Sequence, residues 1–375
     1  MVRDSLPGFF SRQSIPWPLS LAVVADLFNR AGPLSVPQAP IGKDIAQLKL
    51  SVIIPAEKGS GTLERCLESL SSSHHPAHEV LVVGDQIADQ TRQMARPQGF
   101  MVYGQGAWKG RWAGRNLGAA LSSGEILVFL DPEIRIRAET LSRIVEHFSQ
   151  GRAEVLVGTP AFRSLHDSFA SRYESGRMHR AHVQSSEMVP WTSTSLMAME
   201  RSLFFQLGGF RGNFNIPLDG RDMEFGERVI GAGFSIFLDK KLEVDYDERL
   251  SLGRVLRNDF RASSAAVQLV LVSRGFANSR GSRGVVFVPF KLLASVLLAA
   301  LLAVSLVVSP WISWAPRWAL LWLLLYVLAE VRLLRFYRDA FGRIFAGKAL
   351  LVGLMDHLAC GLGMVLGVGR FWWKR

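Results

Sequence analysis

The sequence predicts an α/β protein in which a doubly wound, mostly parallel sheet is followed by C-terminal transmembrane α-helices. Short runs of β-branched and other apolar residues alternate with helix-forming segments along the first half of the chain. Such alternation is typical of parallel strands joined by crossover helices, and these sheets bind ligands beyond the carboxyl ends of their strands. From Val285 to Val368 the composition shifts to Leu, Val, Ala, Trp and Phe, which is typical of membrane segments.

The alternation begins with a strand, a helix and a strand at residues 48–54, 62–71 and 79–84. The second strand is an unbroken apolar run, which indicates a buried parallel strand. We then expect helices at residues 89–95, 115–122 and 138–149, which alternate with strands at residues 100–103 and 126–130. Asp85 and Asp131 follow strands directly, at the edge where ligands bind. A less regular region at residues 161–193 precedes a turn at residues 208–210 and a final helix at residues 222–231.

A chain of 375 residues accommodates one large α/β domain with flanking segments. We expect an interfacial segment and linker at residues 1–47 and the α/β domain at residues 48–250. A basic juxtamembrane segment at residues 251–284 and a transmembrane region at residues 285–375 follow. Prolines interrupt the apolar patch from Trp17 to Val24, so this patch is a poor signal peptide. Residues 19–29 form either an interfacial amphipathic helix or a plain surface helix.

Three apolar segments are candidates for crossing the membrane, at residues 286–308, 318–334 and 349–368. The first two can span as a hairpin. The third contains Asp356 and His357 near its middle, so it either spans or re-enters; we favour a full span with Asp356 facing another helix or water. Basic residues flank these segments, and the positive-inside rule predicts a multi-pass protein of the inner (plasma) membrane with its soluble domain in the cytoplasm.

The net charge of +11 does not indicate a nucleic-acid partner, because the surplus Arg and Lys residues crowd beside the apolar segments. Anionic lipid headgroups are the expected counter-charge, and the basic series before the first segment is expected to touch them or an anionic lipid acceptor: Arg249, Arg254, Arg257 and Arg261. Cys66 and Cys360 lie far apart in the chain, so we expect no disulfide, consistent with a reducing compartment.

Five short motifs carry a family resemblance. In chain order they are SVIIP at Ser51–Pro55, EVLVVGD at Glu79–Asp85, GRWAGRNLG at Gly110–Gly118, Asp-Pro-Glu at Asp131–Glu133 and GRDMEFG at Gly220–Gly226. In that order they resemble family 2 glycosyltransferases. The resemblance covers roughly residues 49–245 and implies a GT-A-like fold and transfer of a sugar from a nucleotide-diphosphate sugar.

The resemblance also assigns roles in binding the metal and the donor. Asp131 and Glu133 match the family's metal-binding Asp-x-Asp, and carboxylate oxygens suit Mg²⁺ or Mn²⁺. We expect the donor to be bound by Pro55, Glu57, Asp85, Lys109, Arg115 and Asp131. Of these, Glu57 is a substitute acceptor near the family's Asn-Glu, which is replaced here, and Lys109 is chosen because it lies on a Gly-flanked loop that can face the diphosphate. Three of the six residues have plainer alternatives. Asp85 can be a turn residue, Glu57 can be a solvent-facing loop residue, and Arg115 can hold its helix against the sheet by pairing with Asp131 or Asp85.

Asp222 matches the acidic residue that serves as the catalytic base in the family. At a helix start the N-terminal dipole is expected to keep its carboxylate ionised and to lower its basicity. Helix capping alone is the alternative role. Elsewhere, we expect the histidines of the connection before residue 79 to lie in a surface loop: His74, His75 and His78. The basic residues at 172–182 are expected to form a solvated helical face or to attract a phosphate-bearing acceptor: Arg172, Arg177, His179, Arg180 and His182.

Taken together, the motifs and the apolar segments predict a membrane-anchored, metal-dependent, inverting glycosyltransferase. Its donor is a nucleotide-diphosphate sugar, and its acceptor is a lipid or a lipid-linked sugar at the cytoplasmic membrane face. The alternative is a catalytically degenerate scaffold or binding subunit of a polysaccharide or lipid assembly complex. That alternative is favoured by departures from the family pattern at Lys58, Gly59, Gly84 and Arg221.

Overall fold

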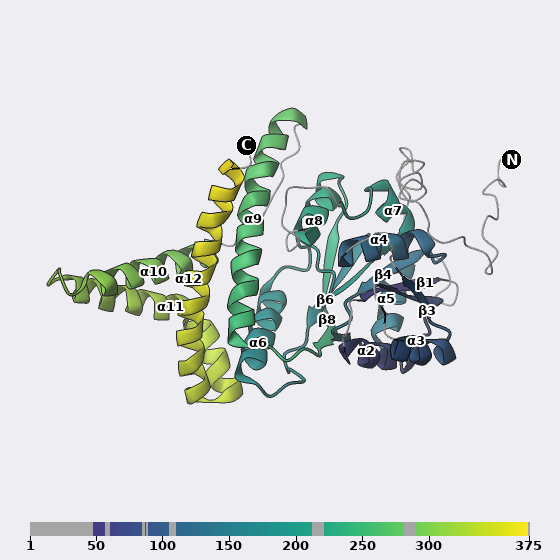
Figure 1. The fold of residues 1–375 in the computed structure, drawn as a ribbon, viewed down its shortest axis with the longest axis horizontal. Helices are drawn as coiled ribbons and strands as arrows, with labels where there is room; N and C mark the ends of the chain where they lie inside the picture. Colours follow the sequence, from purple (N-terminus) through teal and green to yellow (C-terminus); the bar gives the residue numbers. More distant parts are fainter. Residues whose placement is uncertain are drawn as a thin grey trace.

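The computed structural model describes residues 48–56, 61–84, 87, 89–104, 110–211, 221–280 and 290–373. These residues form an eight-stranded mixed sheet with helices on both faces, beside a bundle of four long C-terminal helices (Figure 1). The predicted fold class is therefore confirmed. The expected N-terminal helix over residues 19–29 lies outside the described residues.

The sheet has the order β3-β2-β1-β4-β7-β6-β8-β5. Its strands are β1 Leu50–Ala56, β2 Glu79–Gly84, β3 Met101–Gly104, β4 Ile126–Leu130, β5 Ile134–Arg135, β6 Val155–Pro160, β7 Leu196–Glu200 and β8 Ile236–Tyr246. The first four strands of this order are parallel, as expected, and Val52 pairs with both Val80 and Val128. β7 runs antiparallel to β4 and β6, so the half of the sheet beyond β4 is mixed.

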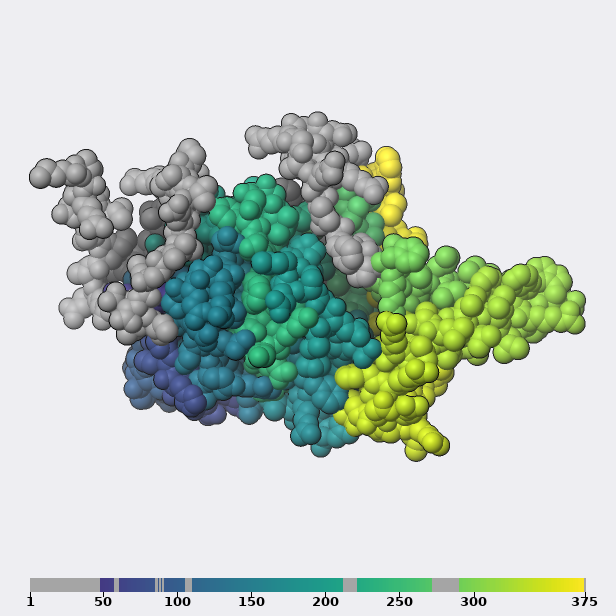
Figure 2. All heavy atoms as spheres, turned by 180° about the vertical axis from the view of Figure 1, so that it is seen from behind, coloured from purple at the N-terminus to yellow at the C-terminus, as the bar shows by residue number. Residues whose placement is uncertain are grey.

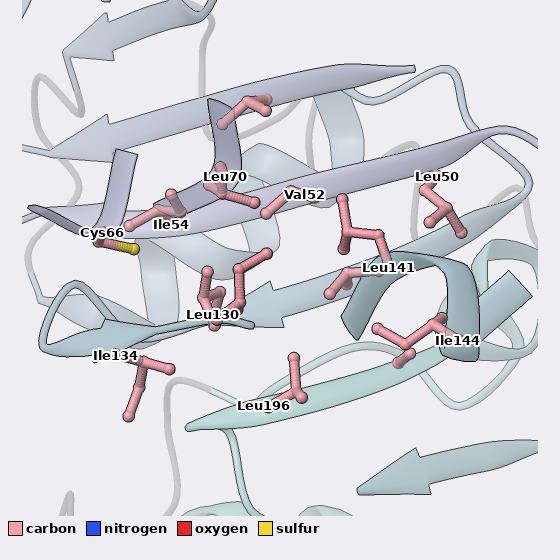
Figure 3. Close-up of a cluster of buried hydrophobic side chains, with 14 of the residues drawn as sticks. Leu50, Val52, Ile54, Cys66, Leu70, Leu130, Ile134, Leu141, Ile144 and Leu196 are labelled. Atoms are coloured by element: carbon pink, nitrogen blue, oxygen red, sulfur yellow. The ribbon is translucent and has the colours of Figure 1, made fainter. Parts of the chain in front are cut away.

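Helices cover both faces of the sheet because successive side chains of each strand point to opposite sides. The helices of the α/β domain are α2 Gly61–Ser71, α3 Asp89–Ala95, α4 Arg111–Leu121, α5 Thr140–Ser149, α6 Phe169–Gln184, α7 Arg201–Gln206 and α8 Arg221–Gly231, with a short 3-10 helix at Arg96–Gln98. Val52 and Ile54 pack with α2 and α5 in the cluster of Figure 3, whereas Ile53 packs on the other face with α4, α7 and α8. This is the doubly wound arrangement.

Gly118 lets α4 lie close against the sheet. A Cβ atom at this position would lie 2.4 Å from Ile53 Cγ2, and Ile53 is fully buried in the central strand β1. α4 carries Arg111 and Arg115, so this close contact sets how near their side chains come to the strand ends.

We expect Gly118→Ala to destabilise the protein by about 1–2 kcal/mol, because the overpacking cost of about 1–3 kcal/mol exceeds the gain in helix propensity. The measurement is thermal unfolding in a fixed detergent. Gly253→Ala is the matched control, since a Cβ there meets nothing within 4 Å. A Gly118→Ala protein as stable as the wild type would show that α4 has room to move away.

The four C-terminal helices are α9 Leu252–Arg280, α10 Phe290–Val308, α11 Ala315–Phe341 and α12 Arg343–Trp373. α9 and α12 run side by side, and α10 with part of α11 projects away from the body (Figures 1 and 2). Glycines allow the close contact of α9 with α12: a Cβ at Gly363 would lie 2.3 Å from the carbonyl oxygen of Phe260.

Two described helices, α10 and α12, are long and apolar enough to cross a membrane. α11 contains the second predicted segment but does not meet this criterion; it carries Glu330, Arg332 and Arg335. α12 is one continuous helix of 31 residues, without the break that a re-entrant segment needs. Asp356 faces the protein interior, with 3% of its surface exposed, as expected for a charge in an apolar helix.

α6 corrects one prediction. The expected irregular region contains this helix of 16 residues, and its basic residues do not form a solvated face. Arg172 and Arg180 lie over the rings of Phe341 and Phe336 on α11, at 5.8 and 5.2 Å from the ring centroids. α6 packs against both the sheet and the C-terminal helices: it contacts β6 and β8, and Tyr173 stacks on Tyr337 of α11.

Candidate active site

The predicted acidic residues gather where β4 ends and α8 begins. Asp131 follows β4, and its amide donates a hydrogen bond of 3.2 Å to the carbonyl oxygen of Ser195, just before β7. Glu133 lies two residues on, and its carbonyl oxygen accepts a hydrogen bond of 2.7 Å from the amide of Asp247, just after β8. The ends of three neighbouring chain segments are thereby joined around the two carboxylates.

Arg115 forms a buried ion pair with Asp131. Its Nη2 donates to Asp131 Oδ1, and the two residues are 2% and 8% exposed. The guanidinium also lies 4.5 Å from the ring centroid of Trp112. Burial and the neighbouring charge of Glu133 raise the pKa of Asp131, while Arg115 and Arg111 lower it; the net direction is upward. Arg115 therefore fixes Asp131 and holds α4 to the sheet, which is the pairing that its plainer alternative expects; binding of the donor by Arg115 stays a prediction.

Glu133 lies farther out and pairs with Arg111, whose Nη1 donates to Glu133 Oε1 over 2.7 Å. The side chains of Arg111 and Glu133 are 34% and 17% exposed, so this pair stands at the mouth of the site. The site thus contains two carboxylates, each held by an arginine of α4.

Asp222 lies in the first turn of α8. Its Oδ1 accepts a hydrogen bond of 2.9 Å from the amide of Met223, and its carbonyl oxygen accepts one of 2.6 Å from Thr192 Oγ1. The charges of Arg115 and Asp131 both act on its carboxylate, so the three groups lie near one another, and we call this region the crevice.

The helix start lowers the pKa of Asp222 as expected, but the net shift of this pKa is opposite to the expected one. Burial raises the pKa of Asp222 to about 6; the Met223 amide and Arg115 lower it, and Asp131 raises it further. Desolvation of the carboxylate therefore outweighs the helix dipole. A carboxylate with a raised pKa is a stronger base, and it is ionised at neutral pH.

Some predicted donor-binding residues cannot be placed. Glu57, Asp85 and Lys109 lie outside the described residues. Pro55 is described: it is buried in β1 and pairs with Val83 of β2. The next pair in this register joins Ala56 to Gly84, the residues just before Glu57 and Asp85. These two strands end at the same edge of the sheet as β4.

Two carboxylates form the described part of the candidate metal site. Within the residues that the structure describes, no three His, Cys, Asp or Glu side chains group as a metal site would. Asp131 and Glu133 supply oxygen donors, which Mg²⁺ and Mn²⁺ prefer, and Mg²⁺ is commonly held by one or two carboxylates together with substrate phosphates and water. The pair fits a divalent cation that a bound diphosphate helps to hold.

Residues after β8 were missed as part of the site. Asp247 accepts hydrogen bonds from Arg65 and Arg135. Glu248 pairs with Arg254 of α9, and the charges of the Glu133 carboxylate and the Arg111 guanidinium also act on it. Their signal was the acidic run Asp245–Glu248, which lies directly beyond a strand. Glu248 links the start of α9 to the crevice.

The histidines before β2 and the two cysteines agree with expectation. His74 and His78 are exposed and His75 is half-buried, so they lie on the surface. Cys66 and Cys360 are free and buried. Arg257 and Arg261 are exposed on α9, and their contact with headgroups remains a prediction.

Comparison with known proteins gives consistent matches. The family model "Glycosyl transferase family 2" matches residues 51–215. Glycosyltransferase AglE of Haloferax volcanii is 25% identical over 236 residues, covering 60% of this chain and 75% of that protein. The 4,4'-diaponeurosporenoate glycosyltransferase of Staphylococcus haemolyticus is 26% identical over 150 residues, covering 38% of this chain and 39% of that protein.

A solved structure matches over almost the whole length. It is the mannosyltransferase PcManGT from Pyrobaculum calidifontis in complex with GDP-Man and Mn²⁺, with a TM-score of 0.51, 15% identity and 95% coverage of both chains. At this identity the likeness concerns the fold, which is GT-A-like. The family-model match places a glycosyl transferase family 2 domain at residues 51–215 of this chain.

Proposed function

We propose that this glycosyltransferase moves a sugar from a nucleotide-diphosphate sugar to a lipid or lipid-linked acceptor at the cytoplasmic face of the inner membrane, with inversion at the anomeric carbon. The observation that carries the proposal is that the Asp222 carboxylate lies near enough to Asp131 and Arg115 for their charges to act on it. A base and a metal-binding carboxylate in one crevice are what an inverting transfer needs.

In this proposal Asp222 is the catalytic base. Its carboxylate takes the proton of the acceptor hydroxyl, and the oxygen attacks the anomeric carbon of the donor sugar. The bond from that carbon to the diphosphate breaks, and its electron pair leaves with the diphosphate. The raised pKa of Asp222 supports this role, because a general base works best when its pKa is near the operating pH.

Asp131 and Glu133 are the residues that would hold Mg²⁺ or Mn²⁺. Such an ion, when bound, neutralises charge on the departing diphosphate. Arg115 acts on the donor through Asp131, which it fixes in place, and Arg111 does the same for Glu133. Pro55, Glu57, Asp85 and Lys109 remain the proposed contacts of the nucleotide and its phosphates.

The proposed membrane anchor comprises the apolar helices of the C-terminal bundle. α10, with 19 residues, is about 28 Å long, close to the thickness of a bilayer's hydrocarbon core. Trp311, Trp314 and Trp318 are exposed around the turn from α10 to α11, and tryptophan is enriched at membrane interfaces. Insertion of these helices would hold the crevice beside the membrane, where a lipid acceptor is available.

The direct test incubates the detergent-solubilised protein with labelled UDP- and GDP-sugars, membrane lipid extract and Mn²⁺. We expect label in a lipid fraction, and we expect a chelator to abolish it. Absence of metal-dependent transfer to every lipid fraction would contradict the proposal.

The raised pKa of Asp222 predicts the pH dependence of the transfer rate. Asp222 must be ionised to accept a proton, so kcat/KM should rise as pH increases through about 6 and fall about tenfold for each unit below that value. The measurement is kcat/KM for the donor between pH 4.5 and 8.5. A profile without an acidic limb near pH 6 would argue against Asp222 as the base.

A further inference from the structure

A cavity of about 360 Å³ lies where the transferase domain meets the C-terminal helices. Its walls come from α6, the start of α8 and all four C-terminal helices, and they are largely apolar. Met223 lines it, and this residue directly follows Asp222, the proposed base. The cavity therefore reaches the residue that follows the proposed base and opens among the helices proposed to enter the membrane, which is where a lipid acceptor must lie.

The charged side chains of the cavity are already paired. Arg177 Nη2 donates to Glu174 Oε2 and Asp259 Oδ2, at 2.8 Å in each case, and Arg177 Nη1 lies 4.0 Å from Asp356 Oδ2. One guanidinium thus serves three carboxylates. Of these charged groups, Arg177, Asp259 and Asp356 line the cavity itself.

Lys291, the second cation among the described residues that line the cavity, is also paired. Lys291 Nζ lies 3.0 Å from Glu330 Oε2, so this pair adds no net charge. Even if one carboxyl of the Arg177 cluster carries a proton, Arg177 and its three acidic partners retain a net negative charge. A phosphate headgroup would meet carboxylates here without a free cation among the described lining residues.

One buried oxygen in this cavity has no partner. Asp356 is 3% exposed and lines the cavity, and its Oδ1 makes no hydrogen bond. Buried polar atoms are nearly always hydrogen-bonded in native proteins, so an orphaned oxygen marks a place for a ligand donor. A carboxylate oxygen accepts a hydrogen bond from a hydroxyl, whereas a phosphate anion offers it no proton.

We propose that this cavity binds the acceptor, and that the acceptor is an uncharged lipid with a hydroxylated headgroup rather than a lipid phosphate. The apolar walls take the chain, one hydroxyl donates to Asp356 Oδ1, and another hydroxyl lies toward Asp222 beside Met223. This inference rests on the proposed function and narrows its acceptor class.

The test compares two lipids that differ by a phosphate. The full-length protein is placed in phosphatidylcholine nanodiscs with a monooleoylglycerol probe that carries a diazirine in its acyl chain, and labelled peptides are mapped by mass spectrometry. We expect labelling of α9 and α12, and we expect unlabelled monooleoylglycerol to compete at least tenfold better than oleoyl lysophosphatidate. Equal or better competition by lysophosphatidate, or labelling confined to other surfaces, would overturn the inference.

Two variants test the cavity itself. Ala266 lines it from α9, so Ala266→Phe should reduce labelling at least tenfold, while Ala340→Phe on the exposed surface of α11 should leave labelling unchanged. Asp356→Leu removes the oxygen that accepts the lipid hydroxyl, whatever its charge, so competition by monooleoylglycerol should weaken relative to lysophosphatidate. General misfolding would weaken both lipids together. An unchanged ratio would overturn the assigned role of Asp356.

Donor binding separates this inference from the proposed function. Binding of nucleotide sugars with Mn²⁺ is measured on the same wild-type nanodiscs. If no nucleotide sugar binds, the proposed function fails, and the inference that rests on it falls too. If a donor binds and a lipid fraction is glycosylated while Ala266→Phe labels like the wild type, only the cavity assignment fails.

Discussion

Asp222→Asn is expected to lower the rate of sugar transfer by about 10²- to 10⁴-fold, the usual contribution of a positioned general base. The amide keeps the shape of the side chain and can still accept a hydrogen bond from the Met223 amide, but it cannot take a proton from the acceptor. Because burial disfavours the charged carboxylate, the variant should unfold at the same or a higher temperature than the wild type at neutral pH.

The measurement is kcat with saturating donor, together with the melting temperature. Asp167→Asn is the matched control, because the Asp167 side chain is 93% exposed, and it should transfer at the wild-type rate. If Asp222→Asn transfers at a similar rate to the wild type, Asp222 is a helix-capping residue. A different outcome would indicate a scaffold: the wild type itself shows no transfer, and the cellular role survives Asp222→Asn.

Asp131→Asn is expected to have the second large effect, a loss of at least about 100-fold in metal-dependent transfer. The same change removes the partner of the buried Arg115, and breaking a buried ion pair costs about 3–5 kcal/mol of stability. The variant should therefore lose both activity and stability.

A double variant separates the two effects of losing Asp131. Arg115→Met together with Asp131→Asn removes the unpaired charge and keeps an apolar contact with Trp112, so stability should largely return. Transfer should stay low, because the metal-binding carboxylate is still missing. Recovery of transfer in the double variant would show that Asp131 acts only as the partner of Arg115.

Local sequence patterns predicted much of the first half of the sheet. β2 and β4 have the expected bounds because each is a continuous apolar run between polar residues. β6, β7 and β8 were not predicted. The antiparallel β7 joins β6 to β4 through long-range pairing that no short motif encodes. The burial of the basic face of α6 could not be predicted for a related reason: the residues that cover this face come in part from α11, far along the chain.

The candidate site shows the same division. The motifs located Asp131, Glu133 and Asp222, and in the structure Asp131 lies near both of the other carboxylates. The state of each group depends on burial and on distant partners, which sequence spacing does not give. Desolvation reversed the expected pKa shift of Asp222, and the Arg177 cluster joins residues that are 82 positions apart in the chain.

Calorimetric titration of nucleotide sugars in the presence of Mn²⁺ tests the central claim most directly, because it separates donor binding from chemistry. The account predicts that the wild type and Asp222→Asn bind one donor with similar affinity, and that Asp131→Asn and chelated wild-type protein lose most of that affinity. Donor binding that is independent of both Mn²⁺ and Asp131 would contradict the account.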